Sequence, residues 1–185
     1  MLTYEMDIAG IKRDLPLCRV SDEVYIGAFV IFGDVELTVH CATELLKRAP
    51  EYDYLIAPEA KSIPLLYEMA RQTGAEKYFL ARKGPKLYMT GIFEVEVRSI
   101  TTMSVQKLVL DTADAELIKG KRILIIDDVI STGESLHAME ELVTKAGGTV
   151  AGRMAVLAEG AAALRQDIIY LAHLPLFKPD GTILN

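Results

Sequence analysis

Runs of apolar residues alternate along the chain with segments in which apolar residues recur every three or four positions. The second pattern is typical of helices with one buried face and predicts helices at 34–49, 62–74 and 134–148. The continuous runs predict buried strands at 23–32, 52–58, 77–82, 122–127, 149–158 and 167–174, and the first of these ranges holds one or two strands. Strands alternating with helices predict an α/β fold: a mostly parallel central sheet flanked by helices.

Residues with known preferences for helix ends support these boundaries. Asp34 precedes the first predicted helix as a candidate N-cap, and Ser62 precedes the second, which has Pro64 in its first turn. Glycines follow the second and third helices, at Gly74 and Gly147, where the backbone can turn out of the helix.

The middle of the chain breaks the alternation. Residues 92–100 and 105–111 have the pattern of two antiparallel strands joined by a polar tip. This segment is either a surface hairpin or a mobile flap over a site.

Composition narrows the class of protein. The chain has 185 residues, enough for one domain, with 51% hydrophobic and 25% charged residues. We expect a cytoplasmic protein, because no apolar run reaches the ~20 residues of a membrane span and the first residues do not resemble a signal peptide. Cys18 and Cys41 are far apart, as expected for reduced structural thiols. The net charge of −6 argues against a nucleic-acid partner.

Two adjacent carboxylates, Asp127 and Asp128, end the most convincing strand. By themselves they fit a solvated strand terminus or a helix N-cap as well as a binding site. The residues that follow, Ser131 to Ser135, bring hydroxyls and Gly133 to the start of a helix, where free N–H groups and the helix dipole favour a phosphate. A phosphate cradle beside two carboxylates suits a 5-phosphorylated ribose, because the carboxylates can accept hydrogen bonds from its vicinal hydroxyls.

The segment "ILIIDDVISTGES" (123–135) resembles the signature of the type I phosphoribosyltransferases. Residues 57–65 resemble the diphosphate loop of the adenine and xanthine branch of that family, and residues 80–86 resemble its Arg-Lys strand end. Residues 97–110 are similar to its flexible catalytic loop. The resemblance implies one domain over 1–185, with a hood from about 1–33 and 168–185 on a core of about 34–167.

The resemblance also implies an activity, a Mg²⁺-dependent transfer of phosphoribose from phosphoribosyl diphosphate to a purine base in purine salvage. The implied catalytic residues are Lys61, Lys107, Asp127 and Asp128. The implied contacts to phosphoribosyl diphosphate are Glu59, Ala60, Lys61, Ser62, Arg82, Lys83, Lys86, Asp127, Asp128, Val129, Ile130, Ser131, Thr132, Gly133, Glu134 and Ser135. A non-proline cis peptide at Ala60–Lys61 would turn the amides of the diphosphate loop inward.

Further implications concern the metal, the base and the partner. Mg²⁺ would lie near Asp127 and Asp128 through water, without direct protein ligands. Ser99, Thr101 and Ser104 would belong to the flexible loop, and the basic cluster of the strand end would reach the site of a second subunit in a homodimer. The base would be flanked by Leu15, Leu17 and Phe177.

Two departures from the family pattern leave the base and the proton acceptor open. The branch for hypoxanthine and guanine usually has a third acid where this chain has Ser131, and the adenine branch usually has a Glu in the flexible loop, where residues 99–107 have none. Adenine and xanthine are therefore favoured equally. The alternative function is a regulator of the same fold that binds phosphoribosyl diphosphate without transferase activity.

Overall fold

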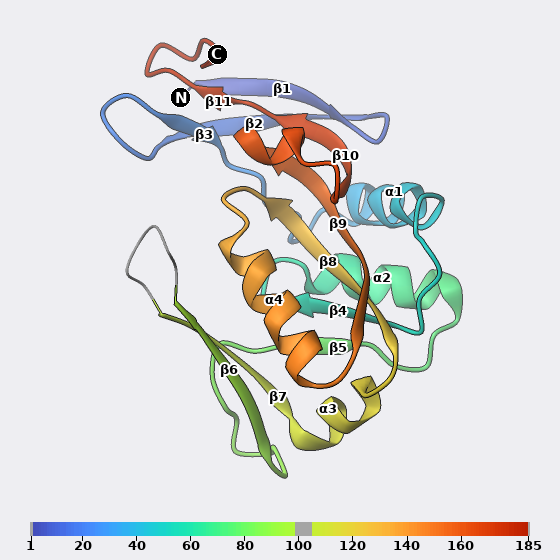
Figure 1. Ribbon diagram of the computed structural model, residues 1–185. Helices are drawn as coiled ribbons and strands as arrows, with labels where there is room; N and C mark the ends of the chain where they lie inside the picture. Colours follow the sequence, from blue (N-terminus) through green and yellow to red (C-terminus); the bar gives the residue numbers. More distant parts are fainter. Residues whose placement is uncertain (1, 99–104, 185) are drawn as a thin grey trace.

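The computed structural model describes residues 2–98 and 105–184, and its centre is a parallel sheet of five strands (Figure 1). The strand order is β10-β9-β8-β4-β5, and each neighbouring pair is parallel. The strands are β4 (Tyr54–Pro58), β5 (Phe79–Ala81), β8 (Arg122–Ile130), β9 (Thr149–Glu159) and β10 (Ile169–Leu174). The predicted α/β class is confirmed.

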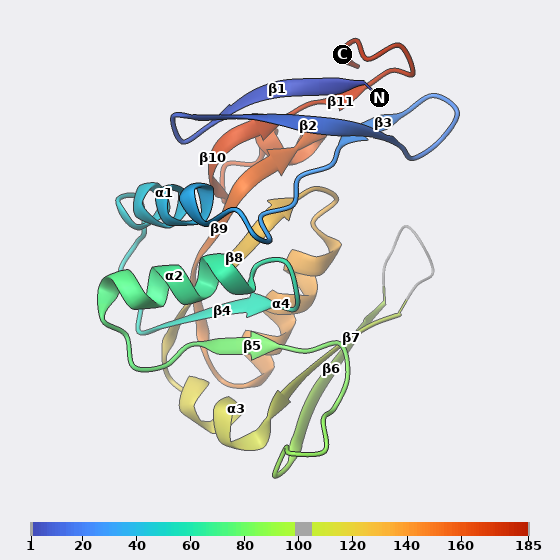
Figure 2. The same ribbon diagram turned by 180° about the vertical axis from the view of Figure 1, so that it is seen from behind.

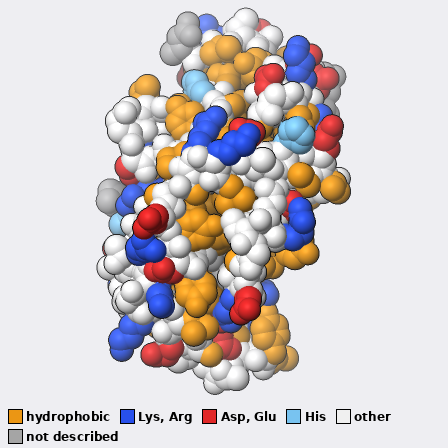
Figure 3. All heavy atoms as spheres, turned by 90° about the vertical axis from the view of Figure 1, so that its right-hand side faces the viewer, with side chains coloured by type: hydrophobic (Ala, Val, Ile, Leu, Met, Phe, Trp, Pro, Cys, Tyr) orange, Lys and Arg blue, Asp and Glu red, His pale blue; other side chains and the backbone are white. Residues whose placement is uncertain are grey.

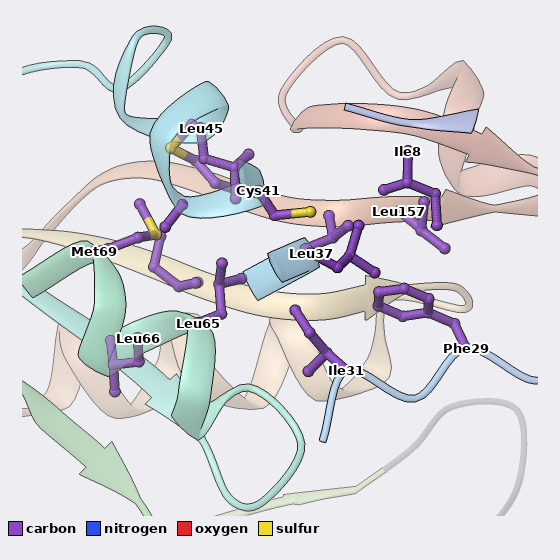
Figure 4. Packing of buried hydrophobic residues seen from close by; sticks show 14 of the residues in the cluster. Ile8, Phe29, Ile31, Leu37, Cys41, Leu45, Leu65, Leu66, Met69 and Leu157 are labelled. Atoms are coloured by element: carbon purple, nitrogen blue, oxygen red, sulfur yellow. The ribbon is translucent and has the colours of Figure 1, made fainter. Parts of the chain in front are cut away.

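Helices cover both faces of this sheet. Figures 1 and 2 show α1 (Val35–Leu46) and α2 (Ile63–Thr73) on one face and α4 (Glu134–Lys145) on the other. The first two helices close a core in which Leu37, Leu65 and Leu157 are fully or almost fully buried (Figure 4). Parallel strands buried on both faces need continuous apolar sequence, which is why the sequence pattern located them.

The predicted helix ends are confirmed within a few residues. The Asp34 carboxylate accepts a hydrogen bond from the Leu37 N–H at 3.0 Å and thereby caps α1. Gly74 ends α2 in the left-handed conformation, with φ of 68°. The short helix α3 (Thr112–Ile118), which leads into β8, was not predicted.

A second, antiparallel sheet lies over the main one at the top of Figure 1. Its order is β1-β2-β3-β11. The strands are β1 (Thr3–Ile8), β2 (Ile11–Arg19), β3 (Tyr25–Gly27) and β11 (Leu176–Phe177). We call this sheet the hood.

The hood corrects two sequence predictions. The strand predicted at 23–32 is only the three residues of β3, and the apolar residues after it form a connection to α1 in which Phe29 and Ile31 are buried. Strand β10, which falls within the C-terminal part assigned to the hood, instead extends the main sheet. Only β11 of that segment joins the hood, and the division of the chain into hood and core stays a prediction.

The segment that breaks the alternation of strands and helices is an antiparallel hairpin of β6 (Ile92–Arg98) and β7 (Val105–Asp111), as predicted. Its buried residues Val95, Leu108 and Leu110 pack in the same core cluster as α4. The hairpin is therefore attached to the α4 face of the sheet, and the predicted tip lies outside the described residues.

The two halves of the main sheet diverge between β4 and β8. From β4 the chain passes through α2 to β5, whereas from β8 it passes through α4 to β9, on the opposite face. In open α/β sheets such a switch point leaves a crevice at the carboxyl ends of the two strands, where ligands bind.

Figure 3 shows the other end of the sheet, toward the amino ends of β4 and β5. On this face Lys and Arg side chains are interspersed with Asp, Glu and hydrophobic side chains rather than gathered into one patch. No helix in the described part of the chain is long and apolar enough to cross a membrane.

Candidate active site

The acidic pair lies at the switch point, at the carboxyl end of β8. Asp127 and Asp128 are both buried, with 8% and 3% of their surface exposed. Ser62, at the start of α2, donates its hydroxyl proton to Asp127 Oδ1 at 2.7 Å and accepts a longer hydrogen bond from the Asp128 N–H at 3.2 Å. The Asp128 N–H also contacts Asp127 Oδ1 at 2.8 Å. These bonds fix the pair against the loop that follows β4.

Burial has a strong effect on the protonation of Asp127. Loss of hydration raises the pKa of Asp127 well above its ordinary value, and the neighbouring charge of Asp128 raises it further, while the Ser62 hydroxyl opposes the shift. Keeping the buried Asp127 carboxylate charged is therefore costly unless a ligand supplies donors. Such sites are candidate functional sites.

Asp128 lacks a complete set of donors. Lys61 Nζ lies 2.8 Å from Asp128 Oδ2, but this buried oxygen accepts no hydrogen bond of normal geometry from the described residues. Lys61 itself is half-exposed. A ligand hydroxyl beside Asp128 would therefore supply the missing donor.

The loop after β4 contains a non-proline cis peptide. The cis bond joins Glu59 and Ala60, so the prediction of a cis peptide in this loop is confirmed, but its placement at Ala60–Lys61 was one bond too late. Glu59 ties the loop to the end of β5: its carboxylate accepts from the Lys83 N–H at 3.0 Å and pairs with the Arg82 guanidinium at 3.2 Å. The Glu59 side chain thus fixes the loop to the residues that follow β5.

The turn after β8 leads directly into α4. Gly133 has φ of 82°, and α4 begins at Glu134. A small hollow of about 40 Å³ lies over this turn, lined among others by Ser131, Thr132 and Ser135. Helix N-termini with free N–H groups bind phosphate, so the hollow has the position and chemistry expected of a phosphate site.

A larger cavity of about 680 Å³ joins these parts. Many of the residues predicted to contact phosphoribosyl diphosphate line it, together with Lys107 of the hairpin: Glu59, Ala60, Lys61, Ser62, Lys83, Asp127, Asp128, Val129 and Ser135. The Lys107 ammonium pairs with Glu94 across the hairpin at 2.6 Å. The structure therefore brings loop, acidic pair and hairpin to one space.

Other predicted residues lie elsewhere. The small hollow over the turn after β8 is lined by Ile130, Ser131, Thr132 and Gly133. Arg82 packs on the Tyr88 ring at 5.6 Å, and Lys86 is exposed outside the large cavity. The prediction for Ser99, Thr101 and Ser104 concerns residues outside the described part of the chain.

The three predicted base contacts are buried. Leu15 and Leu17 are 5% and 7% exposed, and Phe177 is fully buried, with its ring centroid 4.9 Å from that of Tyr4. None of them lines the large cavity. In this structure they hold the hood together, and their contact with a base stays a prediction.

Two charged residues near the site were not found from the sequence. Glu159 ends β9 directly before Gly160, the same arrangement of an acid at a strand end that identified the Asp pair. Arg165 is held by two contacts to Asp167, of 3.0 and 2.7 Å, and its Nη1 lies 2.8 Å from where a Cβ on Gly133 would be. No sequence pattern connects position 165 with position 133.

Comparison with known proteins places this site in a family. Residues 39–172 match the sequence profile of the phosphoribosyl transferase domain. The chain belongs to the phosphoribosyltransferase family. The family that the sequence resemblance indicated is thereby confirmed.

Phosphoribosyltransferases of two kinds are similar to it in sequence. The adenine phosphoribosyltransferase of Thermosipho africanus is 29% identical over 154 residues, which cover 78% of this chain and 83% of the relative. The orotate phosphoribosyltransferase of Caldanaerobacter subterraneus is 28% identical over 132 residues, covering 70% of this chain and 58% of the relative. The two identities are almost equal and do not separate a purine from a pyrimidine base.

Solved phosphoribosyltransferase structures share the fold. The adenine phosphoribosyltransferase of Thermoanaerobacter pseudethanolicus superposes with a TM-score of 0.62 at 23% identity, covering 77% of this chain and 84% of that one. The enzyme of Giardia lamblia, complexed with 9-deazaadenine, also gives 0.62, at 16% identity over 93% of both chains. At these identities the likeness concerns the fold alone.

Proposed function

We propose that the protein transfers phosphoribose from phosphoribosyl diphosphate to a purine base, with adenine or xanthine favoured, and releases diphosphate and a nucleoside monophosphate. The observation that carries the proposal is the buried pair Asp127–Asp128. It is fixed by Ser62 and Lys61 at the switch point, and it lies between a phosphate turn and a large cavity. The order of these parts, a phosphate turn, an acidic pair and a loop of amides beside Lys61, is the order of the groups of a ribose with a 5-phosphate at one end and a diphosphate at the other.

Each part has a role in this reaction. The Asp127 and Asp128 carboxylates accept hydrogen bonds from the ribose hydroxyls, and the N–H groups around Gly133 hold the 5-phosphate. The bond between C1 and the diphosphate oxygen breaks, C1 bonds to a ring nitrogen of the base, and that nitrogen loses its proton. Lys61, Lys107 and the amides of the loop after β4 stabilise the negative charge that develops on the leaving diphosphate.

The residues present fit a magnesium ion held mainly by the substrate. No group of three or more His, Cys, Asp or Glu among the described residues forms a cage for a metal. Mg²⁺ commonly uses one or two carboxylates, water and substrate phosphates, and Asp128 Oδ2 is a buried oxygen that lacks a donor. Asp127 and Asp128 would hold such an ion through water, and it would neutralise charge on the diphosphate.

The base is tested by competition. Adenine, xanthine, hypoxanthine, guanine, orotate and uracil are supplied together at fixed phosphoribosyl diphosphate and Mg²⁺, and the nucleotides formed are quantified. We expect adenine or xanthine to be used at least about tenfold better by kcat/KM than hypoxanthine or guanine, a difference of only ~1.4 kcal/mol in transition-state binding. A preference for orotate, which one relative's name suggests, would contradict the purine assignment.

The same assay separates an enzyme from a regulator. Calorimetric binding of phosphoribosyl diphosphate without transfer to any of the six bases would favour a regulator that uses the ligand as a signal. Transfer to one base at micromolar concentrations would exclude that alternative.

We also propose that the protein is a homodimer in which the basic segment around Arg82, Lys83 and Lys86 reaches the site of the partner subunit. Lys86 is exposed and outside the cavity of its own chain, which leaves it available to a second one. Analytical ultracentrifugation gives the oligomeric state. Mixing inactive Asp128→Asn with inactive Lys86→Ala protein should restore part of the activity only if sites are shared between subunits.

A further inference from the structure

Arg165 lies beside the small hollow over the turn after β8. It follows the short 3-10 helix η1 (Gly160–Leu164), which starts at the carboxyl end of β9, the neighbour of β8 in the sheet. Its Nη1 atom is 2.8 Å from the position that a Cβ on Gly133 would occupy, and Gly133 lines the hollow. Because Gly133 has no side chain, the guanidinium lies directly against the turn.

Contacts to Asp167 fix the orientation of this guanidinium. Arg165 Nε donates to Asp167 Oδ1 at 3.0 Å, and Nη2 donates to Asp167 Oδ2 at 2.7 Å. Asp167 Oδ2 also lies 3.7 Å from the Nε atom of Arg153, which pairs with Glu140 of α4. One edge of the Arg165 guanidinium is thus occupied, whereas Nη1 hydrogen-bonds to no acceptor among the described residues. Its two N–H groups are available to an anion at the turn.

The hollow adjoins the large cavity. The two spaces share the lining residues Asp127, Val129 and Ser135. Asp128 also lines the large cavity, and its buried Oδ2 accepts no hydrogen bond of normal geometry within the described part of the chain. A buried oxygen without a donor indicates a ligand group in the cavity, and a ligand placed there can extend into the hollow.

The charges around the hollow leave a phosphate in need of a cation. Asp127 lines the hollow, and Glu134 begins α4 directly after Gly133. None of the described residues that line the hollow is basic. The helix N-terminus offers only about half a positive charge, whereas a phosphate monoester carries about −1.5 to −2 at pH 7. Arg165 brings a full positive charge to the edge of the hollow.

We infer that Arg165 is a phosphate-binding residue: Asp167 holds its guanidinium against Gly133, and its Nη1 donates to the 5-phosphate of the phosphoribosyl ligand in the turn. The inference rests on the proposed function and adds to the phosphate site a residue that lies outside the segment 123–135. The ligand class is a phosphate monoester on ribose, which substrate and product share. Arginine suits this role because it stays charged and its donors match the geometry of phosphate oxygens.

The test compares Arg165→Gln and Arg165→Lys with wild type. Calorimetry in Mg²⁺ buffer measures binding of ribose 5-phosphate and, separately, of inorganic diphosphate. Steady-state assays give the KM of phosphoribosyl diphosphate and of the base. Arg122→Gln is the matched control, because Arg122 also pairs with an aspartate, Asp53, but lies at the amino end of β8. Thermal melts check that each variant is folded.

We expect Arg165→Gln to weaken binding of ribose 5-phosphate by about tenfold or more, the effect of one lost charge-assisted hydrogen bond. Binding of inorganic diphosphate should be unchanged, because we place that group at the loop after β4. The KM of phosphoribosyl diphosphate should rise and that of the base should not. Arg165→Lys keeps the charge but not the planar fork, so it should recover part of the affinity. Arg122→Gln should bind both ligands as wild type does.

The outcomes separate this inference from the proposed function. Unchanged affinity of Arg165→Gln for ribose 5-phosphate would overturn the inference, and so would an equal loss for both ligands, which indicates a role in the fold alone. If wild type binds ribose 5-phosphate in an Arg165-dependent way but transfers no base, the proposed function fails and the inference stands. If wild type transfers a base and Arg165→Gln has an unchanged KM for phosphoribosyl diphosphate, only the inference fails. If wild type binds neither ribose 5-phosphate nor phosphoribosyl diphosphate, both fall.

Discussion

At the scale of single residues, the site depends on carboxylates held in places that are unfavourable for charge. Asp127 and Asp128 are buried side by side, and among the described residues Ser62, Lys61 and backbone groups offset the loss of hydration. Replacing such a group by a neutral one of the same shape often stabilises the fold, since no charge must then be buried. Stability and ligand binding should therefore respond in opposite directions.

The first prediction concerns Asp127→Asn. The pKa of Asp127 is raised above its ordinary 3.8, so the folded protein holds this proton more tightly than the unfolded chain does. The free energy of unfolding of wild type then falls as pH rises from about 3.8 through the raised pKa, and the variant should lack this fall. Urea denaturation over a pH series measures both profiles. Affinity for phosphoribosyl diphosphate should drop by roughly 1.5 to 3 kcal/mol, the worth of a hydrogen bond to a charged group.

Asp53, whose pKa is lowered rather than raised, provides the control. The Arg122 side chain holds the pKa of Asp53 below its ordinary value, so the stability that this surface pair adds is lost as pH falls. Asp53→Asn should therefore differ from wild type most at neutral pH and leave ligand binding intact. Parallel pH profiles for the two variants, or normal affinity in Asp127→Asn, would refute the assignment of Asp127.

At the scale of elements, the site is built where connections leave the strands. The loop from β4 into α2 supplies Lys61 and Ser62, and the turn from β8 into α4 supplies the small hollow proposed for the phosphate. Each connection has its own backbone requirement. The turn before α4 requires the left-handed conformation at Gly133, which residues with a Cβ rarely adopt.

The second prediction concerns Gly133→Ala. Stability should fall by about 1 to 2 kcal/mol, the cost of a left-handed non-glycine residue, and binding of phosphoribosyl diphosphate should weaken as well, because the turn amides shift. Gly74→Ala, at the end of α2, is the matched control: it has φ of 68°, and nothing lies within 4 Å of a Cβ there. Thermal melts and calorimetry should show similar losses of stability for both variants and a loss of affinity only for Gly133→Ala. Equal affinities would exclude the turn as the phosphate site.

At the scale of the whole molecule, the hood joins strands from the two ends of the described chain in one sheet. Strand β11 near the C-terminus pairs with β3, and Phe177 packs against Tyr4 of β1. The hood is a small sheet joined to the body by few segments, so its large buried side chains contribute much of its cohesion.

The third prediction concerns Phe177→Ala. Removing a fully buried aromatic ring should cost about 3 to 5 kcal/mol of stability, measured by chemical denaturation. Leu164→Ala, at a side chain that is 79% exposed, should cost almost nothing and is the matched truncation. If Phe177→Ala instead kept wild-type stability and raised only the KM of the base, Phe177 would be a base contact, as the sequence resemblance implied.

The sequence by itself determined the class of fold and most of the residues that form the candidate site. Strands buried on both faces must be continuously apolar, so β4, β8 and β9 were visible as runs. The acidic pair and the phosphate turn lie within one short segment, 127–135, and local geometry alone fixes their relation. The hood strands β1 and β2 were missed because polar residues interrupt their apolar positions, which is a weaker signal than a continuous apolar run.

Only the tertiary structure decided which distant residues meet. Ser62 bonds to Asp127 across 65 positions of the chain because β4 and β8 are neighbours in the sheet. Arg165 lies near Gly133 because β9, which leads to Arg165, is the neighbour of β8 on its other side. The same packing buried Leu15, Leu17 and Phe177 inside the hood. Apolar character in the sequence predicts burial, but it does not tell whether a side chain is buried against protein or against a ligand. That distinction depends on the neighbours that the fold provides.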